Sequence, residues 1–371
     1  MKFLFITPNQ QSVPLAFRVS TEGHQSSYAI EFSNDIAIPD VCVLDDPSSG
    51  AIADVLKEQG VKVAFSSRWS SLLKSSPSYN RTALTGFGFK PWDGSPGIPV
   101  TVEGWFNGDK FIASLLAFMY PKLLSGDLGP DVGCMGSVVY GKFNRCKLHD
   151  MTLGAIEKPL RKVSYRGPVS IDLMVSQDGF CAIKLYAAPR AGLLQPVLAS
   201  TKRPISDILI GLATGDKVSS LDLDYWTISV GISIPPFPYV GEPRKVVIDG
   251  LNELNDKHFW LNEETTTGML GYVTSRGKSV REARRRIYRT ITKVNVSDIQ
   301  YRVDIGKDIE QQVGKLYSWK WCNGINFYDG GNNGTHYGGM ELVGSKQGTV
   351  STSGTEYHRS SKCNSQTDTH A

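Results

Sequence analysis

Residues 183–196, IKLYAAPRAGLLQP, have the pattern of a strand that runs into a loop, a place where α/β proteins often carry functional side chains. The segment contains Lys184, Tyr186 and Arg190 but no Asp, Glu, His or Asn. Carboxylates, amide carbonyls and imidazoles are the usual protein ligands of Mg²⁺ and the transition metals. The segment can therefore meet negative charge, but it is not expected to hold a metal ion.

The cysteines and histidines also lack the spacing of a metal site. The six cysteines show no CxxC pair, which favours reduced thiols over a zinc site or a disulfide framework. His149 and His258 stand alone, and His336, His358 and His370 lie in a polar C-terminal segment. We therefore predict no metal site.

Composition indicates a globular protein with sizeable cores, because 40% of the 371 residues are hydrophobic. The 40 basic and 36 acidic residues give a formal charge of +4, too close to balance for an electrostatic nucleic-acid footprint, so nucleic acid is not an expected partner. No run approaches the ~18 apolar residues of a membrane span, and MKFLFIT is too short for a signal peptide. We expect a cytoplasmic location, or one within a particle assembled in the cytoplasm.

The predicted elements divide the chain into four parts. Residues 1–89 alternate apolar runs with a helix closed by Gly60, which predicts a three-layer α/β domain with a parallel sheet. Residues 90–215 contain two hairpins, turning at 107–109 and at Asp178-Gly179. Residues 216–316 read as a small α+β domain, with strands at KVVIDG, HFWLNE and GMLGYVTSRG. Its helix opens at Ser279, with Glu282 at capping-box spacing.

Residues 317–371 are rich in Gly, Ser, Thr and Asn and predict an irregular tail that would be disordered alone. We expect it to dock on neighbouring protein subunits, in a homo-oligomer or a multi-protein particle, so that truncation after Gln312 leaves a folded monomer. Trp319 and Trp321 either anchor this tail to a partner or pack on the preceding domain.

Three segments in order resemble one enzyme family. Residues 127–136 read DLGPDVGCMG, residues 183–196 follow a strand hairpin, and residues 301–306 read YRVDIG. These resemble the D-T-G-P-N-T-G-G-M-G, V-I-E-F-N-x-R-F-G-D-P-E-T-Q-P and Y-R-x-D-I-G segments of the glycinamide ribonucleotide synthetase (phosphoribosylamine–glycine ligase) family of ATP-grasp enzymes. The resemblance implies a reduced ATP-grasp architecture over residues 1–312. It also implies two groups of candidate residues, a ligand loop and a terminal motif: Asp127, Gly129, Asp131, Gly133 and Gly136, and Tyr301, Arg302, Asp304 and Gly306.

The chain departs from this family where the chemistry is performed. The family's Glu and Asn, which hold Mg²⁺ between the ATP phosphates, correspond to Lys184 and Tyr186, so the charge there is reversed. The family's Arg corresponds to Ala188. Only residues 90–99 stand where the family has a whole nucleotide-clamping lobe, and ten residues cannot build a sheet with helices.

These departures favour a non-catalytic descendant that serves as a binding or structural component of a larger assembly, for which a virus particle would be a natural setting. In that hypothesis no cofactor is needed, Asp127 and its loop form a structural turn, and Arg302 and Asp304 form a packing ion pair. One alternative is an ATP-dependent carboxylate–amine ligase of purine biosynthesis that uses ATP and Mg²⁺. Another is a sensor that binds a small ligand through residues 127–136.

Overall fold

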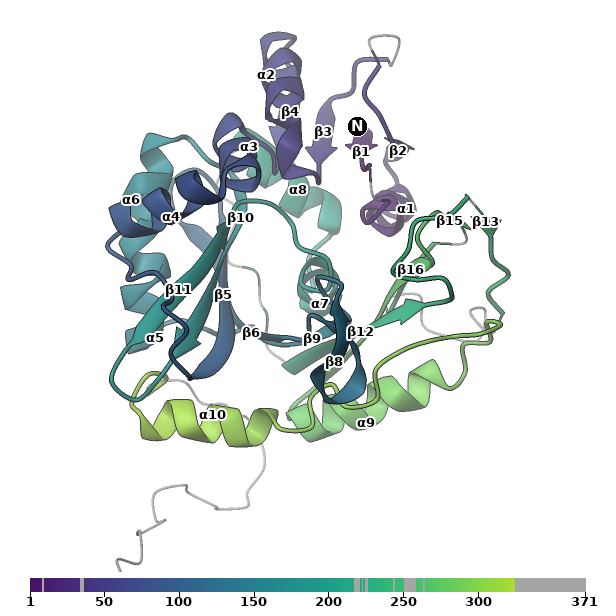
Figure 1. The fold of residues 1–371 in the computed structure, drawn as a ribbon. Coiled ribbons are helices and arrows are strands. Elements are labelled where there is room, and N and C mark those ends of the chain that lie inside the picture. The colour runs from purple at the N-terminus through teal and green to yellow at the C-terminus, as the bar shows by residue number, and fades with distance from the viewer. Residues whose placement is uncertain are drawn as a thin grey trace, which may run out of the picture. The chain divides into compact units, whose positions relative to one another are not determined.

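The computed structural model describes residues 1–323 apart from residues 9, 34–36, 217–220, 222, 224–225, 243, 250–257 and 263. The described residues form one compact unit built on two sheets, which Figure 1 shows with their helices. None of the helices within these ranges is both long enough and apolar enough to cross a bilayer.

The N-terminal sheet is parallel, as predicted, with strand order β2-β1-β3-β4. Alternate residues of β1 enter two separate cores, Phe3 and Phe5 on one face and Leu4 and Ile6 on the other. A parallel sheet buried on both faces gives the three layers expected from the sequence. The elements of this part are β1 (Lys2–Ile6), α1 (Val13–Thr21), β2 (Gln25–Ala29), β3 (Val41–Leu44), α2 (Gly50–Glu58), β4 (Lys62–Ala64), α3 (Arg68–Ser75) and α4 (Pro77–Gly86).

Helices α3 and α4 form in a Ser-rich stretch that the sequence analysis did not assign to helices. Ser67 caps α3 by accepting a hydrogen bond from the N–H of Ser70, and Ser76 caps α4 in the same way through Tyr79. Pro77 occupies the first turn of α4, where its missing N–H costs nothing. The serines therefore start helices here instead of marking a loop.

The second sheet is antiparallel and has the order β11-β10-β5-β6-β9-β12-β16-β14. Both predicted hairpins are present, β5 with β6 and β10 with β11. The predicted division at residue 215 lies within this continuous sheet, because β12 pairs with β9 on one side and β16 on the other. Its strands are β5 (Ile98–Phe106), β6 (Phe111–Met119), β9 (Gly136–Tyr140), β10 (Gly167–Val175), β11 (Phe180–Tyr186), β12 (Trp226–Ser233), β14 (Phe259–Leu261) and β16 (Met269–Gly277).

Two small ribbons complete the strands: β7 (Lys122–Leu124) with β8 (Leu128–Asp131), and β13 (Arg244–Lys245) with β15 (Glu264–Thr265). Only Lys245 of the predicted strand KVVIDG is in a strand, so that expectation was wrong for the described remainder of the segment. Asp249 instead forms an isolated antiparallel β-bridge with Asn295, in which each backbone N–H donates to the other residue's carbonyl.

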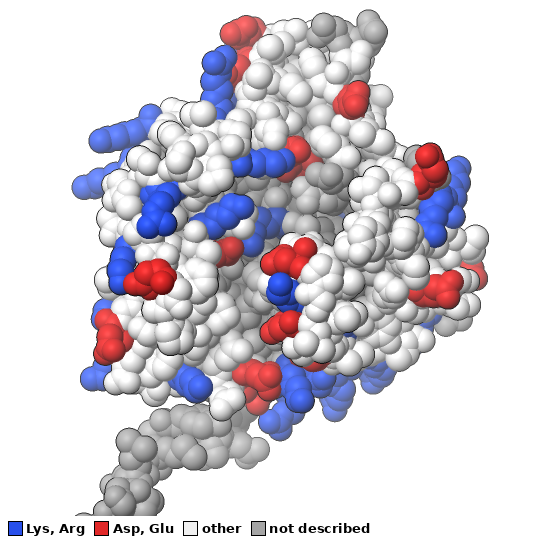
Figure 2. Space-filling view, in the orientation of Figure 1, with Lys and Arg blue, Asp and Glu red and all other residues white. Residues whose placement is uncertain are grey.

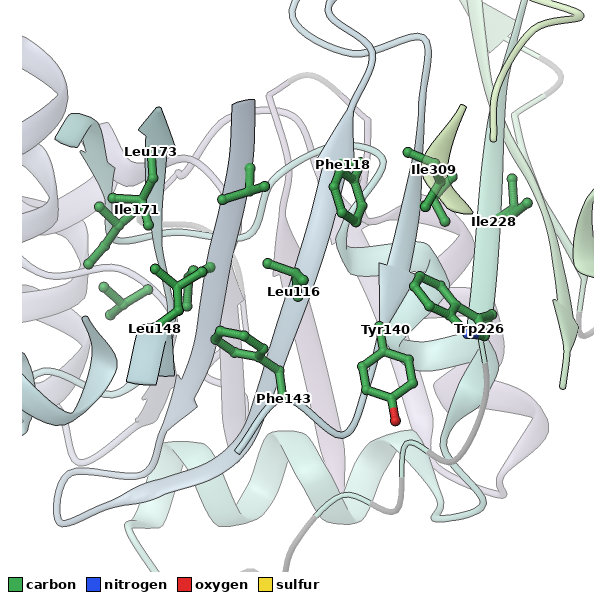
Figure 3. Close-up of a cluster of buried hydrophobic side chains, with 14 of the residues drawn as sticks. Leu116, Phe118, Tyr140, Phe143, Leu148, Ile171, Leu173, Trp226, Ile228 and Ile309 are labelled. Atoms are coloured by element: carbon green, nitrogen blue, oxygen red, sulfur yellow. The ribbon is translucent and has the colours of Figure 1, made fainter. Parts of the chain in front are cut away.

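One face of the large sheet packs against α5 (Lys147–Met151), α6 (Leu153–Lys162), α9 (Val280–Ile291) and α10 (Ile309–Ser318). Figure 3 shows part of this core, in which Leu116 and Phe118 of β6 lie near Leu148, Ile228 and Ile309. The opposite face packs against α7 (Leu194–Ser200), α8 (Ile205–Thr214) and the N-terminal sheet. The large sheet is thus the layer shared by the whole described chain.

Helix α9 follows the sequence prediction. Ser279 accepts a hydrogen bond from the N–H of Glu282, and the Glu282 carboxylate accepts one from the N–H of Lys278. The predicted apolar face of the helix is buried and consists of Val280, Ala283, Ile287 and Ile291. The arginines lie on the other faces of the helix, where Arg281, Arg285 and Arg289 are exposed.

The start of the predicted tail requires a correction. Helix α10 continues to Ser318, and Trp321 and Cys322 are buried in the large core. The indole N–H of Trp321 donates to the Ser176 carbonyl at 2.7 Å, and its ring lies edge-on to Phe180. Trp321 therefore packs on its own domain, and truncation after Gln312 would remove core. Residues 324–371, and with them the predicted docking tail, lie outside the described residues.

We expect Trp321→Ala to lower the free energy of unfolding by about 3–5 kcal/mol, because it leaves a large cavity and an unpaired carbonyl. Tyr317→Ala is the matched control, since Tyr317 is 45% exposed and its loss should cost less than about 1 kcal/mol. Urea denaturation of both variants measures the difference. Equal stabilities would contradict the placement of residues 317–323 in the folded unit.

Candidate ligand-binding site

A row of polar side chains crosses three neighbouring strands of the large sheet on the face that α5, α6, α9 and α10 leave uncovered. Along β5 and β10, the valines, isoleucines and leucines enter the helix-covered core, and the alternate residues point to the opposite face. The register places Glu103 opposite Ser170, and Asp172 opposite both Thr101 and Lys184. The hydroxyl of Thr101 donates to Asp172 Oδ1 at 2.6 Å.

Arg190, in the turn after β11, is the central charge of this row. Its guanidinium donates to both carboxylate oxygens of Asp172, at 2.6 and 3.2 Å. The same guanidinium lies 3.9 Å from the ring centre of Tyr186, and Lys184 Nζ lies 4.8 Å from that ring. Burial opposes the charge, but Asp172 and the Tyr186 hydroxyl hold the pKa of Arg190 above its ordinary value. A permanent cation is thus fixed at this site.

Glu103 is a fully buried carboxyl group beside that cation. Its Oε1 accepts a hydrogen bond from the indole of Trp105 at 3.0 Å, and its Oε2 has no hydrogen-bond partner among the described residues. Burial raises the pKa of Glu103 to about 7, although the Trp105 N–H and Arg190 pull in the opposite direction. The group therefore changes protonation near neutral pH.

A cavity of about 210 Å³ lies between this row and the N-terminal sheet. Lys184, Tyr186 and Arg190 line one side, and Asp45 and Asp46, at the carboxyl end of β3, line the other. Figure 2 shows Lys and Arg side chains along one side of the hollow in the middle of this face. The carboxyl ends of parallel strands are the usual place for a ligand in an α/β domain.

The two aspartates at the cavity differ in environment. Burial raises the pKa of Asp46, but the hydrogen bonds from Lys74 Nζ at 2.8 Å and from Ser48 together outweigh it, and the net pKa is lowered. Asp45 is fully buried, and no hydrogen bond of normal geometry from a described residue reaches either of its carboxylate oxygens. Burial raises the pKa of Asp45 to about 6, although the nearby hydroxyls of Thr7 and Ser12 counter it in part.

The loop of residues 127–136 and the terminal motif are joined by one buried arginine. Arg302, 1% exposed, donates to both oxygens of Asp304 at 2.9 and 2.6 Å and to Asp127 Oδ1 at 2.9 Å. Burial raises the pKa of Asp304, but Arg302 and the N–H of Gly126 outweigh it and lower the pKa to about 2. This is the packing ion pair that we expected as one reading of these residues.

The remaining candidates shape the loop and its contacts. Gly129 and Gly133 adopt positive φ values, and Asp131 accepts a hydrogen bond from the N–H of Gly133. A Cβ at Gly136 would overlap the Ser229 carbonyl and Ile305. Tyr301 is partly buried against the large core. The N–H of Gly306 donates to the hydroxyl of Tyr120 at 2.8 Å.

The far end of the loop meets the Arg190 turn. Ser137 and Ser229 hydroxyls both donate to the Gly192 carbonyl, at 2.5 and 2.9 Å, and the absence of a Cβ at Gly192 leaves room for Cys134. Asp131 lies close enough to act electrostatically on Tyr186. The structure thus brings the three family-like segments together around one part of the sheet.

The site does not fit Mg²⁺ at the position that the family resemblance implies. The two side chains there are Lys184 and Tyr186, and the Arg190 guanidinium lies against the Tyr186 ring. Two cations next to each other repel a third. Within the described parts of the chain, no three His, Cys, Asp or Glu side chains come together as a metal site.

Sequence reasoning missed the carboxyl groups of this site. Asp45 directly follows the buried strand VCVL, a signal for a residue at the carboxyl end of a parallel strand. Glu103 interrupts the apolar strand VTVEGWF, and an acid in such a strand is rarely buried without a reason. Asp172 was predicted only to lie on the hairpin. Its ion pair with Arg190 joins residues 18 positions apart, and the chain reverses direction between β10 and β11 before it reaches Arg190.

Known proteins resemble this chain in sequence and in fold. No family model matches the chain. Phosphoribosylamine–glycine ligases from Helicobacter pylori and Streptomyces coelicolor are 25% and 26% identical to it, over 57% and 50% of this chain and 54% and 50% of theirs. The chain therefore spans about half the length of the curated relatives it matches.

Solved structures show the same fold. The phosphoribosylamine–glycine ligase of Thermotoga maritima superposes with a TM-score of 0.62 at 15% identity, covering 82% of this chain and 100% of that one. N5-carboxyaminoimidazole ribonucleotide synthetase from the same organism gives a TM-score of 0.54 at 12% identity, over 80% of this chain and 99% of that one. The fold is that of the ATP-grasp superfamily, in a truncated form.

Among proteins with this fold, the chain is similar in sequence to the phosphoribosylamine–glycine ligases, also called glycinamide ribonucleotide synthetases. The resemblance seen in the sequence is thereby confirmed.

The buried Asp45 predicts a dependence of stability on pH. An unfolded Asp titrates near pH ~4, and the folded protein holds this proton up to about pH 6. The group therefore adds stability that is full below pH ~4 and is lost as the pH rises through about 6, by about 3 kcal/mol.

Asp45→Asn should remove this part of the pH dependence. The urea midpoint of the variant should therefore exceed that of the wild type by more at pH 7.5 than at pH 4. Asp178→Asn, which removes an exposed turn carboxylate, is the matched control. Urea midpoints between pH 3.5 and 7.5 test the prediction. An Asp45→Asn profile that matches the wild-type profile would show that Asp45 is not a buried, protonatable group.

Proposed function

We propose that the chain is an ATP-dependent carboxylate–amine ligase of the phosphoribosylamine–glycine ligase type. The observation that carries the proposal is that the 127–136 loop contacts the 301–306 motif, through Asp127 and Arg302, and also the Arg190 turn, which itself lines a cavity. These are the segments in which the chain resembles its relatives, and their contacts join residues far apart in the sequence.

In such a ligase, a carboxylate oxygen attacks the terminal phosphorus of ATP, and ADP leaves. The amine then attacks the acyl carbon, and phosphate leaves. Lys184 and Arg190 at the cavity would meet the negative charge of the acyl phosphate, in place of acidic side chains that hold a metal. Asp45 has a pKa of about 6 and lines the same cavity, so it is the candidate to accept the proton released by the amine.

A second candidate is a non-catalytic protein that binds a small anion at this cavity. It is favoured by the charge at the end of β11, where Lys184 and Tyr186 stand in place of the expected metal ligands and the Asp172-bound Arg190 lies against the Tyr186 ring. Residues 324–371 would then supply a docking segment for further subunits. That role in an assembly stays a prediction.

The test is a ligase assay on the purified chain with glycine, freshly prepared phosphoribosylamine, ATP and Mg²⁺, read as phosphate release and as product mass. We expect turnover that falls about 10²-fold or more in Asp45→Asn, because a positioned proton acceptor contributes a factor of that order. Lys158→Gln on the exposed surface of α6 is the matched control and should retain wild-type turnover.

The two candidates differ in one further measurement. A chain without turnover, whose melting temperature nevertheless rises with millimolar glycinamide ribonucleotide in the wild type but not in Arg190→Met, supports the binding protein. A chain with neither turnover nor stabilisation contradicts both candidates. Because Arg190→Met also leaves Asp172 unpaired, its unfolding free energy must be measured alongside.

A further inference from the structure

A second cavity, larger than the first at about 510 Å³, lies beside the edge strand β4. It is bounded by the end of α2, the start of α3, the end of α8 and the segment between α6 and β10. The side chains that matter most are Lys57, Lys62, Ser66, Ser67, Arg166 and Thr214. None of the described residues that line it is acidic.

The side chain of Arg166 at this cavity packs against two glycines. Its Nη1 donates to the Ala213 carbonyl at 2.9 Å. A Cβ at Gly215 would lie 2.6 Å from Nη2, and a Cβ at Gly108 would lie 3.0 Å from Nε, so any larger residue at either position would displace the guanidinium. Both glycines also adopt positive φ, which disfavours other residues. The two glycines therefore leave the space that the guanidinium occupies, and the Ala213 carbonyl orients it there.

One buried hydroxyl of the cavity lacks a hydrogen-bond partner, and one of its lysines is affected by burial and by Arg166. Ser66 is 5% exposed, and its hydroxyl has no hydrogen-bond partner among the described residues. Burial lowers the pKa of Lys57, and the nearby Arg166 lowers it further, whereas Asp54 acts in the opposite direction. The carboxylate of Asp54 is itself paired with Arg68. Lys57 and Arg166 therefore repel one another, and no carboxylate is among the described residues that line the cavity.

Helix ends do not cancel this charge. The carboxyl ends of α2 and α8 reach the cavity and carry about half a negative charge each, and the start of α3 at Ser67 carries about half a positive charge. Three whole positive charges, from Lys57, Lys62 and Arg166, exceed that sum. A dianion would relieve their mutual repulsion and satisfy the buried serine hydroxyl.

We infer that this cavity binds the phosphate group of a sugar phosphate. Lys57, Lys62 and Arg166 meet the phosphate oxygens, and the Ser66 hydroxyl donates one further hydrogen bond. Ser164 supplies a hydroxyl for the sugar, and Thr214 Oγ1, which donates its proton to the Ile210 carbonyl, can accept a hydrogen bond from a sugar hydroxyl. No aromatic ring is among the described lining residues, and the apolar part is the aliphatic Val61, Val63 and Ala213, so a nucleobase would find no stacking partner. The volume exceeds what phosphate alone requires and suits a hexose phosphate.

Calorimetric titration of the whole chain with inorganic phosphate, glucose 6-phosphate and glucose tests the inference. We expect glucose 6-phosphate to bind more tightly than phosphate by at least about tenfold, and glucose to give no heat. Equal affinities for the two phosphates would overturn the sugar-phosphate assignment, and no heat with either at millimolar concentration would overturn the site.

Variants locate the binding. Lys62→Gln and Ser66→Ala should each weaken glucose 6-phosphate binding by about tenfold, because each removes one hydrogen bond to a charged group. Lys158→Gln, an exposed lysine on α6, is the control for general charge and should bind as the wild type does. Lys184→Gln at the first cavity should also leave this binding unchanged.

Weakening by Lys184→Gln and not by Lys62→Gln would place the anion in the first cavity and overturn the inference. Thermal unfolding in the absence of ligand identifies a variant that fails to fold. If Ser66→Ala is such a variant, Lys57→Gln replaces it, because Lys57 is a solvent-exposed residue of α2 and its loss removes no core.

Discussion

The candidate site depends on one buried cation, the guanidinium of Arg190. Its bidentate pair with Asp172 compensates most of the cost of removing both charges from water. The aromatic face of Tyr186 covers the guanidinium, and Lys184 approaches the same ring. Because a cation is part of the fold here, the site is organised for anions. The same cation partly offsets the rise that burial gives to the pKa of the neighbouring Glu103.

This arrangement explains how a relative of ATP-grasp ligases can keep the sheet while its charge pattern changes. The backbone ladder of β10 and β11 does not depend on which side chains project from it. Substituting a lysine and a tyrosine on the projecting face alters the potential at the cavity and leaves the opposite, apolar face in the core. The loop of residues 127–136 is positioned separately, by Arg302 and by the hydroxyls of Ser137 and Ser229.

Much of the local structure could be predicted from sequence. The Asp178-Gly179 turn, the parallel N-terminal strands and the capped, amphipathic α9 each depend on residues near one another in the chain. The Ser-rich helices α3 and α4 were missed because serine favours both caps and loops. Trp321 was ambiguous, since only the fold shows that Ser176 and Phe180 lie within its reach.

The functional constellation was harder to predict, because its members come from segments that are far apart in the sequence. The family resemblance identified Lys184, Tyr186 and the two motifs, and the structure added Asp45, Glu103 and the Asp172–Arg190 pair. None of these three additions follows a spacing rule. They become evident only when the strand register and the burial of each carboxyl group are known.

The joint between the two sheets has a consequence for how a ligand could enter. Phe65 has a φ of +84°, rare for an aromatic residue, and its buried ring lies edge-on to Trp105 of β5 at 6.0 Å. Such a conformation persists only where its surroundings enforce it. A residue so constrained is a poor hinge, because hinge motion requires freely changing backbone angles. We therefore expect the joint at Phe65 to resist hinge motion between the two sheets.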